Sequence, residues 1–152
     1  EDFLATDLIA YVDAAYPTID DRTGRSVGGI SMGGFAALHL AFRHPDLFAR
    51  VGGHSPALVT DPEFTWLYPD DETAATRNPL LVAESTHLAD LTVHLDVGEQ
   101  DQWGFEPPTR ELAEILDDRG IDVVLDVSPG GHDVSYWAPN VEEYLRFYGA
   151  ST

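Results

Sequence analysis

Apolar residues recur along this chain with two periods, one of about 3.6 residues and one of about two residues. The longer period predicts helices over residues 2–15, 31–44, 81–88, 107–120 and 141–148. Short apolar or alternating runs predict strands over residues 25–30, 50–53, 91–97 and 121–127. Strands that alternate with helices in this way favour the α/β class, with a mostly parallel sheet of about four strands flanked by helices.

Turn-forming residues sharpen several of these boundaries. Two prolines open the helix over 107–120 and Gly120 closes it, an asymmetry typical of helix ends. In the strand over 121–127 apolar residues alternate with Asp122 and Asp126, which predicts an edge strand with one wet face. Residues 55–78 are rich in proline, so we expect loops and short helical turns that cover a pocket.

Size and composition fit a single domain over residues 1–152. The 152 residues are 43% hydrophobic, enough for one core. No segment resembles a transmembrane span or a signal peptide, so no membrane partner is expected. The chain begins at Glu1 inside a helical pattern, which is compatible with a longer precursor. The absence of cysteine excludes disulfides and thiolate nucleophiles and leaves the localisation unknown.

The charge balance is strongly acidic. The chain has 27 acidic residues, eight arginines and no lysine, which gives a net charge of −19. Nucleic acid is therefore excluded as a partner, because phosphate contacts need cationic groups. The acidic residues are scattered, which predicts a solvated acidic surface. Two explanations fit this acidic surface: adaptation to high salt, or a lysine-poor surface that favours solubility.

The stretch over residues 27–35 contains the most informative motif. Gly29, Ser31 and Gly33 form a G-x-S-x-G pattern between a predicted strand and a predicted helix. This pattern is typical of a nucleophile elbow, in which small residues let the backbone turn sharply and expose the serine hydroxyl. A glycine-rich turn without chemistry is the alternative.

Two later loops supply partners for this serine. Asp101 follows the strand over 91–97, and His132 follows the strand over 121–127 in a glycine-rich loop. The order serine, acid, histidine is that of α/β-hydrolases, and parallel strands would bring all three loops to one edge of the sheet. Ser31 is then the nucleophile, His132 the base and Asp101 the residue that orients the imidazole. The other acidic candidates are Asp96, Glu99 and Asp133.

Further residues near these loops are candidates for binding. The backbone N–H of Met32 is expected to donate to an oxyanion, because it opens the helix after Ser31. Trp103 and Trp137 flank the acid and the base and are candidate substrate-binding residues, with core packing as the alternative. His54 is a further candidate for lining the pocket. No histidine spacing indicates a metal site.

At these residues the chain resembles the "Putative esterase" (esterase D-like) family of α/β-hydrolases. The segments that carry the resemblance are 28–38, 44–48, 96–101 and 131–137. The resemblance implies hydrolysis of a small-molecule carboxylic ester through an acyl-enzyme, without a cofactor. An acyltransferase or a thioesterase would use the same residues.

The chain departs from the family pattern at its N-terminal side. Family members normally have several strands before the helix over 2–15, and a loop among those strands donates a second oxyanion N–H. The chain therefore resembles a truncated α/β-hydrolase. Its exposed sheet edge predicts a homo-oligomer, most simply a dimer formed through residues 25–30 or 2–15. A fragment of a complete hydrolase and a non-catalytic remnant that acts as an interaction module are the alternatives.

Overall fold

A sheet of four parallel strands forms the centre of the computed structural model, which describes residues 1–60, 67–88 and 90–149. The strands lie in sequence order: β1 (Ser26–Ile30), β2 (Arg50–His54), β3 (Thr92–Gly98) and β4 (Asp122–Ser128). Each strand lies within a residue or two of the segment that the apolar pattern predicts. The α/β class and the four-stranded parallel sheet are therefore confirmed.

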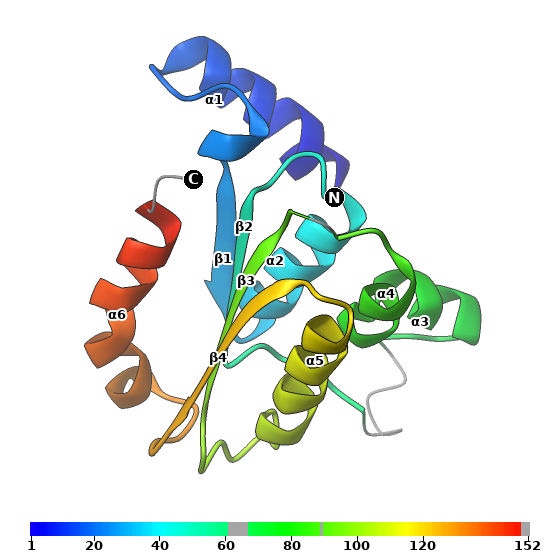
Figure 1. The fold of residues 1–152 in the computed structure, drawn as a ribbon, viewed down its shortest axis with the longest axis vertical. Coiled ribbons are helices and arrows are strands. Elements are labelled where there is room, and N and C mark those ends of the chain that lie inside the picture. The colour runs from blue at the N-terminus through cyan, green and yellow to red at the C-terminus, as the bar shows by residue number, and fades with distance from the viewer. Residues whose placement is uncertain (61–66, 89, 150–152) are drawn as a thin grey trace.

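The helices cover the two faces of this sheet unequally. They are η1 (Phe3–Leu8), α1 (Ile9–Ala15), η2 (Arg22–Gly24), α2 (Met32–Arg43), α3 (Asp71–Arg77), α4 (Pro79–Ser85), α5 (Glu106–Asp118) and α6 (Val134–Gly149). Figure 1 shows α2, α4 and α5 on one side of the sheet and α6 alone on the other. None of the helices within the described residues is long and apolar enough to cross a membrane.

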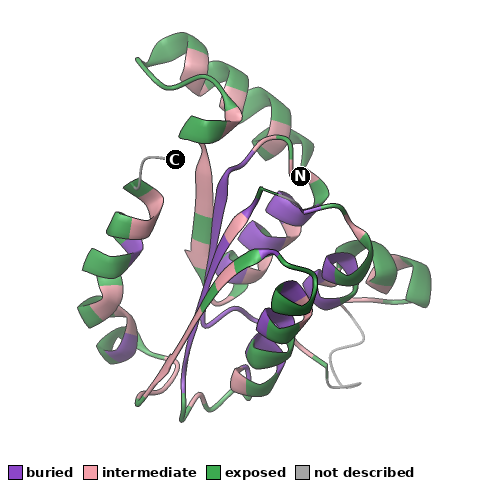
Figure 2. Cartoon of the chain, viewed as in Figure 1, coloured by how far each residue is buried: buried purple, intermediate pink, exposed green. Residues whose placement is uncertain are grey.

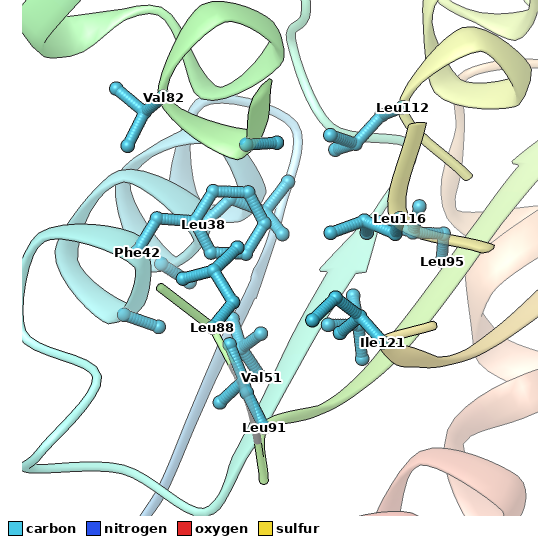
Figure 3. Packing of buried hydrophobic residues seen from close by; sticks show 14 of the residues in the cluster. Leu38, Phe42, Val51, Val82, Leu88, Leu91, Leu95, Leu112, Leu116 and Ile121 are labelled. Carbon is cyan, nitrogen blue, oxygen red and sulfur yellow. The ribbon is translucent and has the colours of Figure 1, made fainter. Parts of the chain in front are cut away.

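The main apolar core lies between the sheet and the α2, α4 and α5 layer. Figure 3 shows the packing of its buried side chains, among them Leu38 and Phe42 of α2, Val51 of β2, Leu95 of β3 and Leu116 of α5. Burial of each such side chain stabilises the fold by about 1.5–3 kcal/mol. This layer therefore holds the three loops that follow β1, β3 and β4 in fixed relative positions.

The face of the sheet toward α6 is polar and aromatic. Since side chains alternate along a strand, Val93 and Leu95 point into the apolar core while His94 and Asp96 point toward α6. His94 and Asp96 are both buried, at 3% and 2% exposure. Burial of such groups requires polar partners, which here are Asp126 of β4 for His94 and His54 of β2 for Asp96.

The predicted N-terminal helix is present, and most of its apolar residues are exposed. It is helical over Phe3–Ala15, as η1 followed by α1. However, Ala5 and Ile9 pack only partly against the core, whereas Phe3 and Tyr11 are each 62% exposed. Figure 2 shows this segment mostly exposed. The apolar stripe that the sequence displays is therefore largely uncovered within the described residues.

Helix α6 begins seven residues earlier than the predicted segment over 141–148. It starts at Val134 and contains Pro139. The Asp133 side chain accepts a hydrogen bond from the Ser135 N–H at 2.8 Å and so satisfies one free donor of the first turn. Tyr136 and Tyr144, buried on either side of Pro139, hold the helix against the sheet. Packing of these two side chains thus outweighs the helix-breaking tendency of the proline between them.

The proline-rich stretch over 55–78 is only partly described. It contains α3, and α4 begins directly after it. Residues 61–66 of this stretch lie outside the described residues.

Candidate active site

Ser31 lies at the turn between β1 and α2 in a strained backbone conformation. Its φ is 59° and its ψ is −121°, a region that L-residues rarely adopt. Hydrogen bonds hold both of its backbone groups. The Ser31 N–H donates to the His54 carbonyl at 2.9 Å, and the Ser31 carbonyl accepts from the Phe35 and Ala57 N–H groups at 3.0 Å each. The turn is therefore fixed independently of the serine side chain.

The two glycines of the motif meet different surroundings. A Cβ on Gly29 would lie 2.5 Å from the Gly33 carbonyl carbon, so the turn leaves no room for a side chain there. A Cβ on Gly33 would meet nothing within 4 Å. The steric reason given for both glycines from the sequence therefore holds for Gly29 only.

Three side chains from three different loops meet at the carboxyl edge of the sheet. The Ser31 Oγ lies 2.8 Å from His132 Nε2, and His132 Nδ1 lies 2.8 Å from Asp101 Oδ2. The Asp101 side chain is fully buried and that of His132 is 9% exposed. The second carboxylate oxygen of Asp101 accepts the Trp103 N–H at 2.9 Å. This arrangement fixes the orientation of the carboxylate toward the imidazole.

Two glutamines join the loop that carries Asp101 to the loop that carries His132. Gln100 Oε1 accepts the Gly130 N–H at 2.9 Å, and Gln102 Oε1 accepts the His132 N–H at 2.9 Å. Neither glutamine was predicted from the sequence to have this role. The sequence offered only a general indication. The backbone N–H groups of a glycine-rich loop need hydrogen-bond acceptors, and the polar side chains of the neighbouring loop are the nearest ones.

Aromatic rings surround the His132 imidazole. Trp137 packs edge to face against it at a centroid distance of 4.9 Å, and Phe105 does so at 5.3 Å. The Trp137 Nε1–H donates to the Oγ of Ser55, which is fully buried, at 3.0 Å. Trp103, whose backbone N–H binds Asp101, is 62% exposed. Trp137 thus contacts the imidazole directly, while Trp103 presents its ring to solvent.

The structure places His54 differently from the pocket-lining position expected for it. Its side chain lies on the α6 face and is 3% exposed. His54 Nδ1 lies 2.6 Å from Asp96 Oδ2, and Nε2 lies 2.7 Å from the Tyr148 hydroxyl. Both ring nitrogens therefore have partners within the fold, and only the His54 backbone carbonyl reaches Ser31.

The other acidic candidates have different partners. Asp96 binds His54 on the α6 face, and Glu99 accepts from the Gln100 amide at 3.2 Å. Hydrogen bonds from Ser135 keep the pKa of Asp133 below its ordinary value, so this carboxylate is engaged at the start of α6. Asp101 is thus the carboxylate that contacts His132 Nδ1.

The start of α2 supplies backbone donors beside Ser31. Met32 is the first residue of this helix, so its N–H belongs to the four that have no intrahelical acceptor. The positive end of the helix dipole favours negative charge at the same place. The arrangement can therefore stabilise an anion next to the serine hydroxyl.

The fold defined here is that of the α/β-hydrolases, and sequence comparison places the chain more narrowly. It belongs to the "Putative esterase" family, whose profile matches residues 1–148. Protein YjcH of Bacillus subtilis (strain 168) is 24% identical over 153 residues, which cover 95% of this chain and 57% of that protein. An acetyl esterase of Caldicellulosiruptor saccharolyticus is 24% identical over 158 residues, which cover 90% of this chain and 58% of the enzyme.

A solved structure shares the same fold. A ferulic acid esterase superposes with a TM-score of 0.79 at 23% identity, covering 97% of this chain and 59% of that one. The chain therefore spans a little under 60% of the length of these relatives.

Proposed function

We propose that this chain carries the catalytic groups of a serine carboxylic-ester hydrolase that acts through an acyl-enzyme. The observation that supports this most directly is the continuous line of contacts from Ser31 Oγ to His132 Nε2 and from His132 Nδ1 to Asp101, at 2.8 Å each. Both distances lie within the range for a nucleophile, its base and the group that orients the base. Membership of an esterase family agrees with this chemistry.

In the first half of the reaction the Ser31 oxygen attacks the ester carbonyl carbon. His132 Nε2 accepts the hydroxyl proton as the new C–O bond forms, and the carbonyl oxygen becomes an oxyanion. The tetrahedral intermediate then collapses, the bond to the alcohol breaks, and the imidazolium returns its proton to the leaving alcohol. Asp101 holds the proton on Nδ1 and stabilises the imidazolium while it exists.

In the second half water replaces the alcohol. His132 Nε2 takes a proton from the attacking water, and the acyl carbon again passes through an oxyanion. Collapse breaks the bond to Ser31, returns the proton to the serine oxygen and releases the carboxylic acid. Water is the only co-reactant, so this reaction balances without a cofactor.

Stabilisation of the oxyanion is the part of the reaction for which the described residues supply the fewest hydrogen-bond donors. The Met32 N–H at the start of α2 is the donor we assign to it. Serine hydrolases use at least two donors, and loss of one costs about 10²–10³ in rate. We therefore expect turnover to be slow unless further residues contribute a second donor.

The substrate we propose is a small-molecule ester with a compact acyl group. Trp137 offers aromatic surface against the imidazole, and the exposed Trp103 lies two residues after Asp101. The relatives named above are an acetyl esterase and a ferulic acid esterase, one acting on a small acyl group and the other on an aryl acid. A short acyl chain together with an aromatic group is the combination that suits these surroundings.

The proposal is tested by hydrolysis of p-nitrophenyl acetate by the chain and by Ser31→Ala. We expect the variant to fall to the background rate, since loss of the nucleophile costs about 10⁴–10⁶ in kcat in serine hydrolases. Ser85→Ala is the matched control, because Ser85 is an exposed serine at the end of α4. It should hydrolyse the ester as the unmodified chain does.

A second measurement does not depend on the choice of ester. A fluorophosphonate should form one covalent adduct per chain, and peptide mass spectrometry should find it on Ser31 and not in Ser31→Ala. Equal ester hydrolysis by the chain and by Ser31→Ala, without an adduct on Ser31, would rule out the proposal.

A further inference from the structure

A second polar site lies on the opposite face of the sheet from the apolar core. A cavity of about 240 Å³ opens between β3, β4 and α6. Its walls include His94 and Asp96 from β3, Asp126 from β4, and Glu143 and Tyr144 from α6. None of these residues takes part in the proposed ester hydrolysis.

Three of these side chains converge with the spacing of metal ligands. One donor atom from each of His94, Asp126 and Glu143 lies within 4.8 Å of the other two. His94 Nε2 and Asp126 Oδ2 are 3.0 Å apart. Ligands at about 2.1 Å from a tetrahedral zinc ion lie about 3.4 Å from one another, so His94 and Asp126 are near this spacing and Glu143 lies within reach of it.

The fold explains why these ligands meet. Asp96 pairs with Asp126 across β3 and β4, and His94 lies two residues before Asp96 on the same face. The imidazole is held by packing, edge to face against Phe147 at a centroid distance of 5.2 Å. The ligands come from three different elements, which is why sequence spacing gave no indication of them.

A second observation points to a ligand in this cavity. Asp96 is 2% exposed and its Oδ1 has no hydrogen-bond partner among the described residues. The hydroxyls of Tyr136 and Tyr144 lie beside the Asp96 carboxylate and are likewise buried, and neither forms a hydrogen bond of normal geometry there. All three residues line the cavity. Because buried polar atoms rarely stay unpaired, these three are suited to hold the water molecules of a hydrated cation.

The charge around the cavity favours a cation as well. Asp96, Asp126 and Glu143 are three carboxylates close together in a chain of net charge −19. Arg146 lines the adjoining cavity, but its guanidinium binds Glu142 at 2.5 Å. The mutual repulsion of these carboxylates is therefore relieved most directly by a divalent ion.

We propose that His94, Asp126 and Glu143 bind a zinc ion that fastens α6 to β3 and β4. Imidazole nitrogen with two carboxylate oxygens is a donor set that zinc accepts, and water fills the fourth position. The ion would stabilise the helix that begins two residues after His132. The site is independent of the proposed function, because it shares no residue with it.

Titration calorimetry with zinc chloride on the whole chain is the first test. We expect one equivalent to bind, and Tm to rise by about 5–10 °C at a free zinc concentration of 100 times Kd. Cobalt(II) bound at the same site should give visible absorption bands typical of four-coordinate nitrogen and oxygen ligation. Neither readout depends on ester hydrolysis.

Variants distinguish zinc binding at this site from nonspecific attraction of cations to an acidic protein. Asp126→Asn and Glu143→Gln should each weaken zinc binding by at least about 10-fold, because each removes a ligand. Both side chains are exposed, so the variants should fold. Glu111→Gln removes the same charge from the exposed face of α5 and should leave the affinity within about 2-fold. Absence of a one-to-one binding event, or equal weakening by all three variants, would overturn the proposal.

Discussion

At the scale of single residues, the two glycines that flank Ser31 have separate roles. Gly29 is needed because the backbone of Gly33 lies against it, whereas the Cα of Gly33 faces open space. Gly33 belongs to the first turn of α2, where it lacks a steric reason to be glycine. The turn therefore depends on one of the two positions.

This difference predicts opposite effects of the same substitution. Gly29→Ala should lower the free energy of unfolding by about 1–3 kcal/mol, because its Cβ meets backbone that cannot move aside. Gly33→Ala should leave stability unchanged or raise it by up to about 1 kcal/mol, because alanine loses less conformational entropy in a helix. Urea unfolding of the two variants measures both values. Equal destabilisation by the two would contradict the geometry.

The Gln102 side chain offers a second prediction at this scale. Gln102→Leu removes the acceptor of the His132 N–H, so we expect the rate of serine acylation to fall by about 10-fold with a small loss of stability. Gln102→Glu keeps an acceptor oxygen at the same place and should retain most of the rate. The rate of fluorophosphonate labelling measures this step directly. Equal labelling by the leucine variant and the unmodified chain would show that the contact has no positioning role.

The meeting of the three proposed reacting side chains was easier to predict than the contacts that hold them in place. Ser31, Asp101 and His132 were chosen because each follows a strand, and parallel strands bring such loops to one edge. Gln102 could not be found this way, since a lone amide belongs to no motif. His54 was misplaced because β2 is rich in glycine, and a strand with few apolar side chains does not reveal which face each residue occupies.

At the scale of elements, α6 is held against the sheet by a contact that only glycine permits. A Cβ on Gly28 or on Gly52 would overlap the Tyr148 hydroxyl. That hydroxyl lies 2.7 Å from His54 Nε2. The two glycines thus form a hollow in β1 and β2 that lets Tyr148 reach the buried imidazole.

This contact predicts coupling between α6 and the sheet. Tyr148→Phe should cost about 1–3 kcal/mol of stability, because it leaves a buried ring nitrogen without a partner. Gly52→Ala should displace the same hydroxyl and cost a similar amount. In the double variant the two losses should not add, with a coupling of about 1 kcal/mol or more from urea unfolding of all four chains. Additive losses would show that the hydroxyl is not seated between the glycines.

The apolar pattern predicted the strands more accurately than the ends of the helices. The alternation of apolar and polar residues in β4 predicted both its place at the edge of the sheet and its solvent-exposed face, because burial on one side imposes a period of two. The start of α6 was missed because local sequence does not reveal the packing of Tyr136 and Tyr144. The helix over residues 2–15 was predicted correctly, whereas the partial contact of Ala5 and Ile9 with the core could not be inferred from its apolar stripe.

At the scale of the whole molecule, exposed apolar side chains and net charge have opposite effects on association between copies of the chain. Phe3, Leu4 and Tyr11 are exposed on the N-terminal helical segment, and the edge of β1 is unpaired within the described residues. Both features favour association with a second copy of the chain. A net charge of −19 opposes that association at low ionic strength.

We therefore expect the oligomeric state to depend on salt. Raising sodium chloride from 0.1 M to 1 M shortens the Debye length from about 10 Å to about 3 Å and weakens the repulsion between copies. Light scattering coupled to size-exclusion chromatography should show the mass shift from one copy toward two. A mass that stays at one copy in 1 M salt would contradict this expectation.

A variant can identify the surface involved. Leu4→Glu combined with Tyr11→Glu should keep the chain monomeric in 1 M salt, because it places charge on the exposed apolar stripe. Leu145→Glu is the matched control, since Leu145 is 66% exposed on α6, away from that stripe. It should dimerise as the unmodified chain does.

The four strands do not contribute equally to the proposed chemistry. Ser31 follows β1, Asp101 follows β3 and His132 follows β4. Strand β2 lies between β1 and β3 and holds these two strands two spacings apart, about 10 Å. The chain after β2 supplies backbone and side-chain supports as far as Ala57 and none of the reacting groups. Between Leu58 and α4, whose Leu80 and Val82 belong to the apolar core, the chain is therefore less constrained by the reaction, and we expect changes of ester preference to arise there without altering the reactivity of the serine.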